Sequence, residues 1–189
     1  TNVDAGFPSR LIAVDSHGRV YLNNANSNEH YGGRIFRFAG DPIAREHVGV
    51  VNYFSLDLGY GRPANPVAMA IGDWNDGQRI VEDLFVANVD SDGYFDPNIP
   101  PTNRVLRVPV HYKEANPDYP ANRIVGQPYA EHPEFRFTGP SDLAVDRRDA
   151  IADGVARNLY LSDEDILFVI EPGEPGGSGV VKKLVEIPG

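Results

Sequence analysis

The chain has 189 residues, of which 41% are hydrophobic and 23% charged, enough for one domain with a sizeable core. Its 27 acidic and 17 basic side chains give a net charge of −10, which repels nucleic acid and anionic lipid. Cysteine is absent, which excludes disulfides, thiolate metal sites and a cysteine nucleophile. No apolar stretch reaches the roughly 18 residues of a spanning helix. We therefore expect a single domain, 1–189, with no nucleic-acid partner and no membrane insertion.

The remaining composition favours an exported protein that folds. Its 19 glycines and 16 prolines stay below the roughly 25–30% expected of a disordered low-complexity chain, so they predict many turns within a folded domain. A chain that begins at Thr1 without Met, and that is acidic and rich in turn residues, suits export. We expect an extracellular or periplasmic location.

The first part of the chain, about residues 7–65, predicts four short strands. After Pro8, an apolar stretch ends in Asp15 and is followed by a turn at His17-Gly18. Alternating apolar positions with β-branched and aromatic side chains are typical of strands and not of helices. The expected strands are 10–15, 20–24, 34–38 and one within 48–58.

The same order of elements recurs in two more units, about 66–139 and 140–189. Each unit begins with a proline, continues with a short apolar strand and an Asp, and then has a turn that contains glycine. In the second unit the expected strands are 69–73, 84–88, 104–108 and one within 123–137. In the third unit they are 143–146, 159–163, 166–170 and one within 180–187.

This pattern of Pro, apolar strand, Asp, Gly turn, aromatic-aliphatic strand and Arg-Ile or Arg-Val strand resembles the NHL-type propeller repeat. The middle unit, through 72–77 (GDWNDG), is also similar to the FG-GAP repeat of other propellers. The resemblance implies an all-β fold, a β-propeller or partial propeller of about three four-stranded blades. Propellers close with about four to eight blades. We therefore expect further chain, a second copy or another protein chain to complete it, or a hidden fourth blade in 39–65 or 109–137.

Open blade faces expose apolar surface, which favours association through them. On the first unit we expect contacts around Leu11, Val14, Tyr21 and Leu22. On the last unit we expect them around Leu167, Val169 and Leu184.

The loop after the second strand of the middle unit carries the strongest candidate for a metal site. Its oxygen ligands are spaced as in the first nine places of a calcium loop, with Gly93 at the sharp turn. A closing glutamate is missing, because Ile99 stands at position 12. A polar hairpin loop explains the same residues without a metal. The expected ligands are Asn88, Asp90, Asp92, Asp96 and the backbone carbonyl of Tyr94.

A second acidic cluster lies between the first two strands of the same unit. The FG-GAP resemblance implies a metal-binding loop there, although the spacing departs from that family, and an Asp-Gly turn is the alternative. The third unit has the looser set Asp146, Asp149 and Asp153. The residues of the second cluster are Asp73, Asn75, Asp76 and Asp83.

The other polar residues give weaker indications of a catalytic or metal site. The histidines fall in predicted loops or strand ends without a metal-ligand spacing, which favours a solvated surface; they are His17, His30, His47, His111 and His132. Ser178 lies in a glycine-proline loop that lacks the strand-to-helix turn of a nucleophile. One residue ends the second strand of each unit, and the three are expected near one rim, where they either cap turns or share a ligand. They are Asn24, Asn88 and Asp163.

We expect a non-enzymatic binding or scaffold module of an exported protein, one component of a larger extracellular or cell-envelope assembly. The alternative is a calcium- or zinc-dependent propeller hydrolase or lyase. An enzyme needs polar side chains from several blades to converge at one point, and this convergence discriminates between the two hypotheses.

Overall fold

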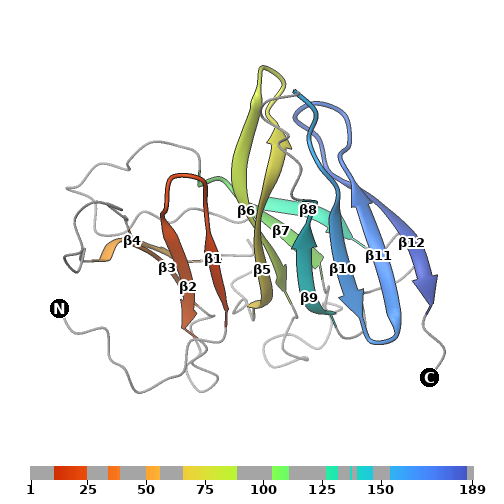
Figure 1. The fold of residues 1–189 in the computed structure, drawn as a ribbon, viewed down its shortest axis with the longest axis horizontal. Coiled ribbons are helices and arrows are strands. Elements are labelled where there is room, and N and C mark those ends of the chain that lie inside the picture. The colour runs from red at the N-terminus through yellow and green to blue at the C-terminus, as the bar shows by residue number, and fades with distance from the viewer. Residues whose placement is uncertain are drawn as a thin grey trace, which may run out of the picture.

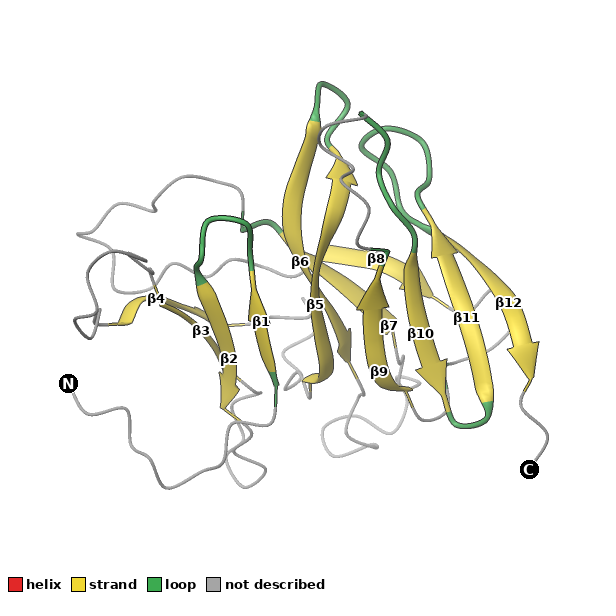
Figure 2. Cartoon of the chain, viewed as in Figure 1, coloured by secondary structure: helices red, strands yellow, loops and turns green. Residues whose placement is uncertain are grey.

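The computed structural model describes residues 11–24, 34–38, 50–55, 66–88, 104–110, 127–131, 137, 140–146 and 154–186. Within these ranges the chain forms β-strands and no helix, as Figures 1 and 2 show. This confirms the all-β fold class for the described residues. None of them belongs to a helix that could span a membrane.

The strands form three antiparallel sheets of four strands each, and every sheet follows the chain in order. The first sheet contains β1 (Ile12–Val14), β2 (Val20–Asn24), β3 (Arg34–Phe38) and β4 (Val50–Ser55). The second contains β5 (Pro66–Asn75), β6 (Ile80–Asn88), β7 (Arg104–Val108) and β8 (Gln127–Glu131). The third contains β9 (Pro140–Val145), β10 (Leu159–Asp163), β11 (Ile166–Glu171) and β12 (Val180–Glu186).

The first strands of the three sheets lie next to one another in chain order (Figure 1), because β5 contacts both β1 and β9. The later strands of each sheet extend away from this row (Figure 1). One face of the second sheet therefore packs on the first sheet and the other face packs on the third.

Two apolar cores fill the spaces between the sheets. The core between the first and second sheets contains Ala13, Tyr21, Ile35, Met69, Leu84, Val86, Val108 and Val110. The core between the second and third sheets includes two edge-to-face ring pairs, Phe85–Tyr129 at 4.8 Å and Phe137–Phe168 at 5.4 Å between centroids. Such pairs stabilise by about 0.5–1.5 kcal/mol beyond their burial. The three sheets are thus held as a packed series.

The hairpin of β5 and β6 is longer than the rest of its sheet and projects beyond it (Figure 2). Its turn uses Gly77 at φ 94°, a conformation that residues with a side chain rarely adopt. The loop 172–179 between β11 and β12 lies against this hairpin, since the amide of Gly176 donates to the carbonyl oxygen of Asn75 at 2.7 Å. The second and third sheets are therefore joined by core packing and also by contacts of this loop.

The sequence assigned some residues to the wrong face. Tyr21 is fully buried toward the second sheet, and Leu11 packs against the same core, so neither lies on the open side of the first sheet. In a strand successive side chains point to opposite faces, and an error of one position reverses the assignment. Val169 is on the expected face, because it pairs in register with Tyr160 and is not part of the core that contains Phe168 and Ile170, although it is only 8% exposed. Val14 and Leu184, each 55% exposed, do lie where contacts were expected.

Candidate functional site

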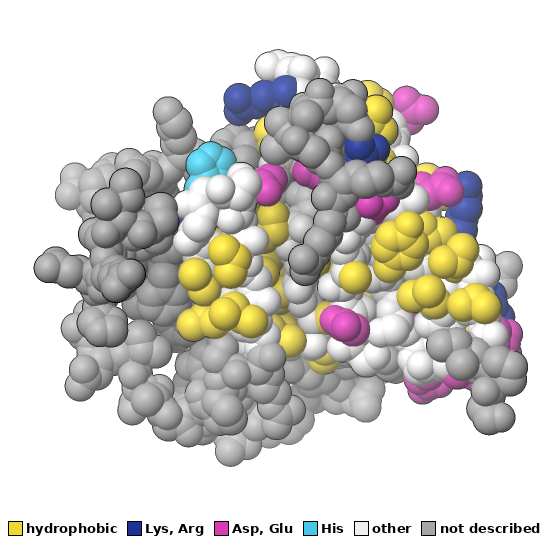
Figure 3. Space-filling view, viewed as in Figure 1, with side chains coloured by type: hydrophobic (Ala, Val, Ile, Leu, Met, Phe, Trp, Pro, Cys, Tyr) yellow, Lys and Arg dark blue, Asp and Glu magenta, His cyan; other side chains and the backbone are white. Residues whose placement is uncertain are grey.

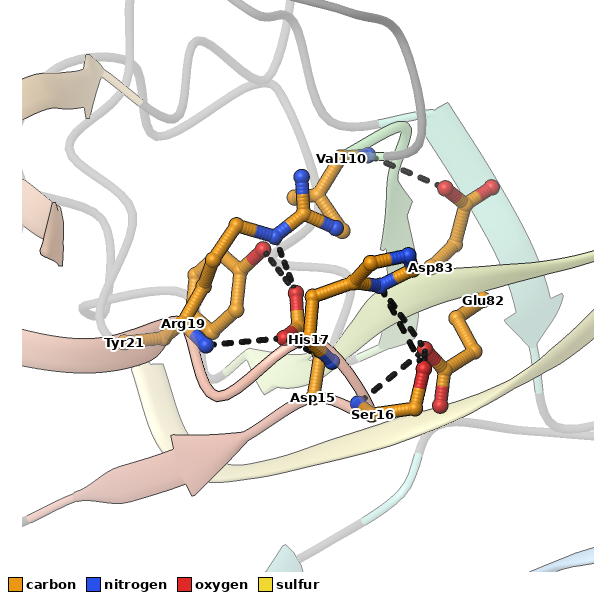
Figure 4. Close-up of polar contacts among 8 residues, drawn as sticks. All are labelled: Asp15, Ser16, His17, Arg19, Tyr21, Glu82, Asp83 and Val110. Carbon is orange, nitrogen blue, oxygen red and sulfur yellow. Dashed lines mark hydrogen bonds and ion pairs between the residues drawn. The ribbon is translucent and has the colours of Figure 1, made fainter. Parts of the chain in front are cut away.

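The tight turn after β1 is organised by the carboxylate of Asp15, which is 6% exposed at the junction of the first two sheets (Figure 4). One oxygen accepts hydrogen bonds from the backbone amides of His17 at 3.0 Å and Arg19 at 2.9 Å. The other accepts from the hydroxyl of Tyr21 at 3.0 Å and from Nε of Arg19. Because an aspartate side chain can bond its own turn, these contacts fix the turn and the buried tyrosine. The group is structural.

Beside this turn, Ser16, His17 and Glu82 form an exposed cluster that joins the first sheet to β6 (Figure 4). The hydroxyl of Ser16 donates to Glu82 Oε2 and lies 3.3 Å from Nδ1 of His17. The same ring nitrogen lies 3.9 Å from Glu82 Oε2.

A serine nucleophile needs one imidazole nitrogen facing the hydroxyl and the other facing the carboxylate. Here both groups approach Nδ1, and the serine proton goes to the carboxylate instead of the imidazole. The cluster of Ser16, His17 and Glu82 therefore lacks the geometry of a catalytic triad and instead links two sheets.

Asp83 belongs to a buried ion pair. Its carboxylate accepts from Nη1 of Arg107 at 2.7 Å and from the backbone amide of Val110 at 2.9 Å. The guanidinium also donates to Gln127 Oε1 at 2.5 Å, and its carbon lies 3.5 Å from the centroid of the Trp74 ring. Both oxygens of Asp83 are engaged, so this carboxylate holds β6 and β7 together.

The other residues of the predicted acidic cluster lie at the turn of the long hairpin. Asn75 Oδ1 accepts from the amide of Gly77 at 2.9 Å, and Asp76 Oδ1 accepts from two further turn amides at 2.8 Å. Asp73 pairs in register with Glu82 across the hairpin. Over the described part of the chain, no three His, Asp or Glu side chains gather as a metal site requires. The structure thus separates Asp83 from Asn75 and Asp76, and the turn interpretation accounts for the latter two.

Asn88, the first residue of the predicted calcium loop, ends β6 and is fully buried. Among the described residues it is unusual, because neither its amide oxygen nor its amide nitrogen has a hydrogen-bond partner. A buried polar group without a partner costs about 1–3 kcal/mol, so a ligand or water at this amide would stabilise the fold. Several residues of the predicted sites lie outside the described residues: Asp90, Asp92, Tyr94, Asp96, Asp149 and Asp153.

The rim residues and the remaining histidines are only partly described. Asp163 is 2% exposed at the end of β10, in the same strand position as Asn88. The side chain of Asn24 lies outside the described residues, as do His30, His47, His111 and His132. Asp146 follows β9 and is partly buried. A shared rim site therefore stays a prediction.

The junction of the second and third sheets holds a polar arrangement that sequence reasoning missed. The indole of Trp74 donates to the carbonyl oxygen of Gly177 at 3.1 Å. The backbone amide of Gly179 donates to the backbone carbonyl oxygen of Tyr129 at 2.9 Å. Burial raises the pKa of the Tyr129 hydroxyl to about 12, partly offset by the charge of Arg107. The glycines of this loop were the available signal, because they allow the backbone to approach closely.

A cavity of about 10 Å³ lies at this junction, between Trp74, Tyr129 and the loop 172–177. That is room for about one water molecule and not for a substrate. Ser178 is exposed in this loop and is not part of a nucleophile turn. The junction therefore serves to join two sheets.

Searches against protein-family models, curated proteins and solved structures found no match to this chain.

Proposed function

We propose that the three sheets are blades of a partial β-propeller of the NHL type. The support is that each sheet is a four-stranded antiparallel meander in chain order, with its first strand next to the first strand of the neighbouring sheet. A propeller places the first strands of its blades around an axis and stacks the sheets face to face. The two apolar cores between the sheets fit such stacking.

On this scaffold we propose a non-enzymatic binding function. The observation that carries it is the exposure of large apolar side chains at both ends of the series: Ile12 is 65% and Val14 55% exposed on β1, and Leu184 is 55% and Val185 46% exposed on β12. Figure 3 shows hydrophobic side chains over β1 and β2 and, separately, over β10 to β12. Gathered exposed apolar residues mark interaction sites on soluble proteins.

The polar clusters support the same conclusion. Asp15 and Asp83, the buried carboxylates described above, bind turn amides, a tyrosine and an arginine of their own chain. These contacts stabilise the sheets and leave the carboxylates committed to structure. We therefore propose a scaffold module of an exported protein, acting within a larger extracellular or cell-envelope assembly.

Calcium at the loop 88–96 is part of the proposal. Its support is the buried amide oxygen of Asn88, which has no hydrogen-bond donor within the described chain and is of the ligand type that calcium prefers. The same observation is what favours the alternative function, a metal-dependent propeller hydrolase or lyase. In that case the calcium would lie at a site of convergent side chains from several blades.

A photoreactive amino acid placed at Val14 tests the binding function. We expect it to form covalent adducts with a protein partner, either another copy of the chain or a protein in an extract of the source cells, whereas the same group at the exposed hairpin residue Gln78 forms none. Adduct formation should persist in a calcium chelator if calcium is structural. Absence of adducts at position 14, or equal labelling at both positions, would show that the outer face of the first sheet binds nothing.

A further inference from the structure

The three sheets repeat one residue pair in register, an alanine on the first strand opposite an aromatic residue on the second. The pairs are Ala13–Tyr21, Ala70–Phe85 and Ala144–Tyr160. Directly paired residues of neighbouring antiparallel strands share a face. In the first two sheets this face packs on the following sheet: Tyr21 lies in the core shared with β5 and β6, and Phe85 in the core shared with β9 and β10. We call it the aromatic face.

The opposite face of each sheet repeats a second pair, made of two aliphatic residues: Ile12–Leu22, Met69–Val86 and Leu143–Leu161. In the second and third sheets this face packs on the preceding sheet. All four of the residues concerned are buried there, with exposures between 0 and 8%. We call it the aliphatic face. Each contact within the chain therefore joins an aromatic face to the aliphatic face of the next sheet.

Two of these faces have no partner sheet within the described part of the chain. The aliphatic face of the first sheet leaves Ile12 65% exposed, although its equivalents Met69 and Leu143 are 8% and 5% exposed. The aromatic face of the third sheet leaves Ala144 exposed and Tyr160 partly exposed, although the equivalent rings of Tyr21 and Phe85 are fully buried. The two open faces are the two halves of the contact that the chain makes twice internally.

We propose that a second copy of this chain covers them, with the aromatic face of the third sheet of one copy packed on the aliphatic face of the first sheet of the other. This rests on the proposed binding function and names the partner. Because the two faces differ, the contact is heterologous, and a two-copy assembly makes it twice and closes as a ring of six sheets.

Among the described residues, only one of the two faces of this contact carries charged side chains. The described residues of the aliphatic face on β1 and β2 are all uncharged: Ile12, Val14, Val20 and Leu22. On the aromatic face of the third sheet, register adds Ser162, Leu167 and Val169 next to Ala144 and Tyr160. The same face carries Asp142 opposite Ser162, and Lys182, which is opposite Val169 and forms an ion pair with Glu171. Because these charges face an uncharged surface, the contact brings no like charges together, and apolar burial drives the association.

Sedimentation equilibrium of the purified chain gives the first test. We expect a mass of twice the 20.7 kDa of one chain at micromolar concentration. Ile12→Glu buries a charge in the proposed contact and should weaken association at least tenfold. Gln78→Glu adds the same charge at the exposed hairpin turn and should leave the mass unchanged. A monomer at these concentrations, or equal effects of the two variants, would overturn the proposal.

Disulfide cross-linking tests the geometry, since the chain has no cysteine of its own. A mixture of Ile12→Cys chains with Ala144→Cys chains, oxidised by copper–phenanthroline, should give a linked pair. Each variant alone should not, and neither should Gln78→Cys mixed with Ala144→Cys. Linkage of Ile12→Cys to itself would instead show a symmetric contact between first sheets and would overturn the head-to-tail arrangement.

The two proposals fail separately. If the chain is a monomer but the photoreactive group at Val14 captures a different protein, the binding function stands and the second copy is excluded. If the chain is a monomer and position 14 captures nothing, both proposals are wrong.

Discussion

Loss of the ion pair between Asp83 and Arg107 is expected to destabilise the chain more than any surface change. Nη1 of Arg107 and Oδ2 of Asp83 are 2.7 Å apart, and the side chain of Arg107 is 8% exposed and that of Asp83 0%. Removing one partner of a buried pair leaves an uncompensated charge and costs about 3–5 kcal/mol. Because Gln127 and the ring of Trp74 still contact the guanidinium, we expect Asp83→Asn to cost about 3 kcal/mol, the lower end of that range.

Urea unfolding at fixed protein concentration measures this cost. Trp74 is the single tryptophan of the chain and contacts Arg107, so its fluorescence reports directly on the site. The double variant Asp83→Asn/Arg107→Met should be less destabilised than the sum of the single variants, because neither charge is then left alone.

The matched control is Glu186→Gln, which removes an exposed ion pair to Lys183 and should leave the urea midpoint nearly unchanged. If Asp83→Asn unfolds at the same urea concentration as Glu186→Gln, the ion pair does not stabilise the junction of β6 and β7 and the reasoning is refuted.

Three further changes probe other parts of the fold. Burial raises the pKa of Tyr129 to about 12 from the 10.0 of an exposed tyrosine. The unfolded chain therefore loses this proton first, and the free energy of unfolding should fall by up to about 3 kcal/mol as pH rises from 10 to 12. Urea midpoints across this range should fall less in Tyr129→Phe. Gly179→Ala places a Cβ 2.6 Å from Ile170 and should cost about 1–3 kcal/mol in thermal unfolding, whereas exposed Ser178→Ala should cost under about 0.5. Asp92→Ala should lower the melting temperature in calcium but not in chelator, whereas Asp76→Ala should lower it equally in both; identical melting of the unmutated chain with and without calcium would contradict the calcium proposal.

The strands themselves could be predicted from the sequence because their signals are local. The expected strands 20–24, 34–38, 104–108 and 159–163 coincide with β2, β3, β7 and β10. The long hairpin was underestimated, since Gly72 was taken near a strand end. In the structure β5 continues to Asn75, and a side chain at Gly72 would lie 2.9 Å from Leu159 of the third sheet. The glycine allows close packing of two sheets and does not end a strand.

The candidate site was harder to predict because its contacts join distant parts of the chain. Asp83 was grouped with the acidic residues before it, whereas its partner Arg107 lies 24 positions later on a neighbouring strand. Similarly, Glu82 reaches Ser16 and His17 across 66 and 65 positions, and no local pattern pairs these residues. The hydrogen bonds of the turn residues Asn75 and Asp76 fit the Asp-Gly turn alternative, because their partners lie within three positions.

The outer face of the first sheet has the residue types of an internal sheet, which supports the proposed association. Repeat proteins that end in solution carry a terminal unit with a polar outer face, because an apolar one lowers solubility. The first sheet instead has Ile12, Val14, Val20 and Leu22 on that face. They are equivalent in register to the buried Met69, Leu84 and Val86 and the partly buried Ile71 of the second sheet. Its residues are those of an internal sheet, although Ile12 is 65% exposed and Met69 only 8%. This repetition of the chemistry of an internal sheet supports the proposal that another sheet covers this face.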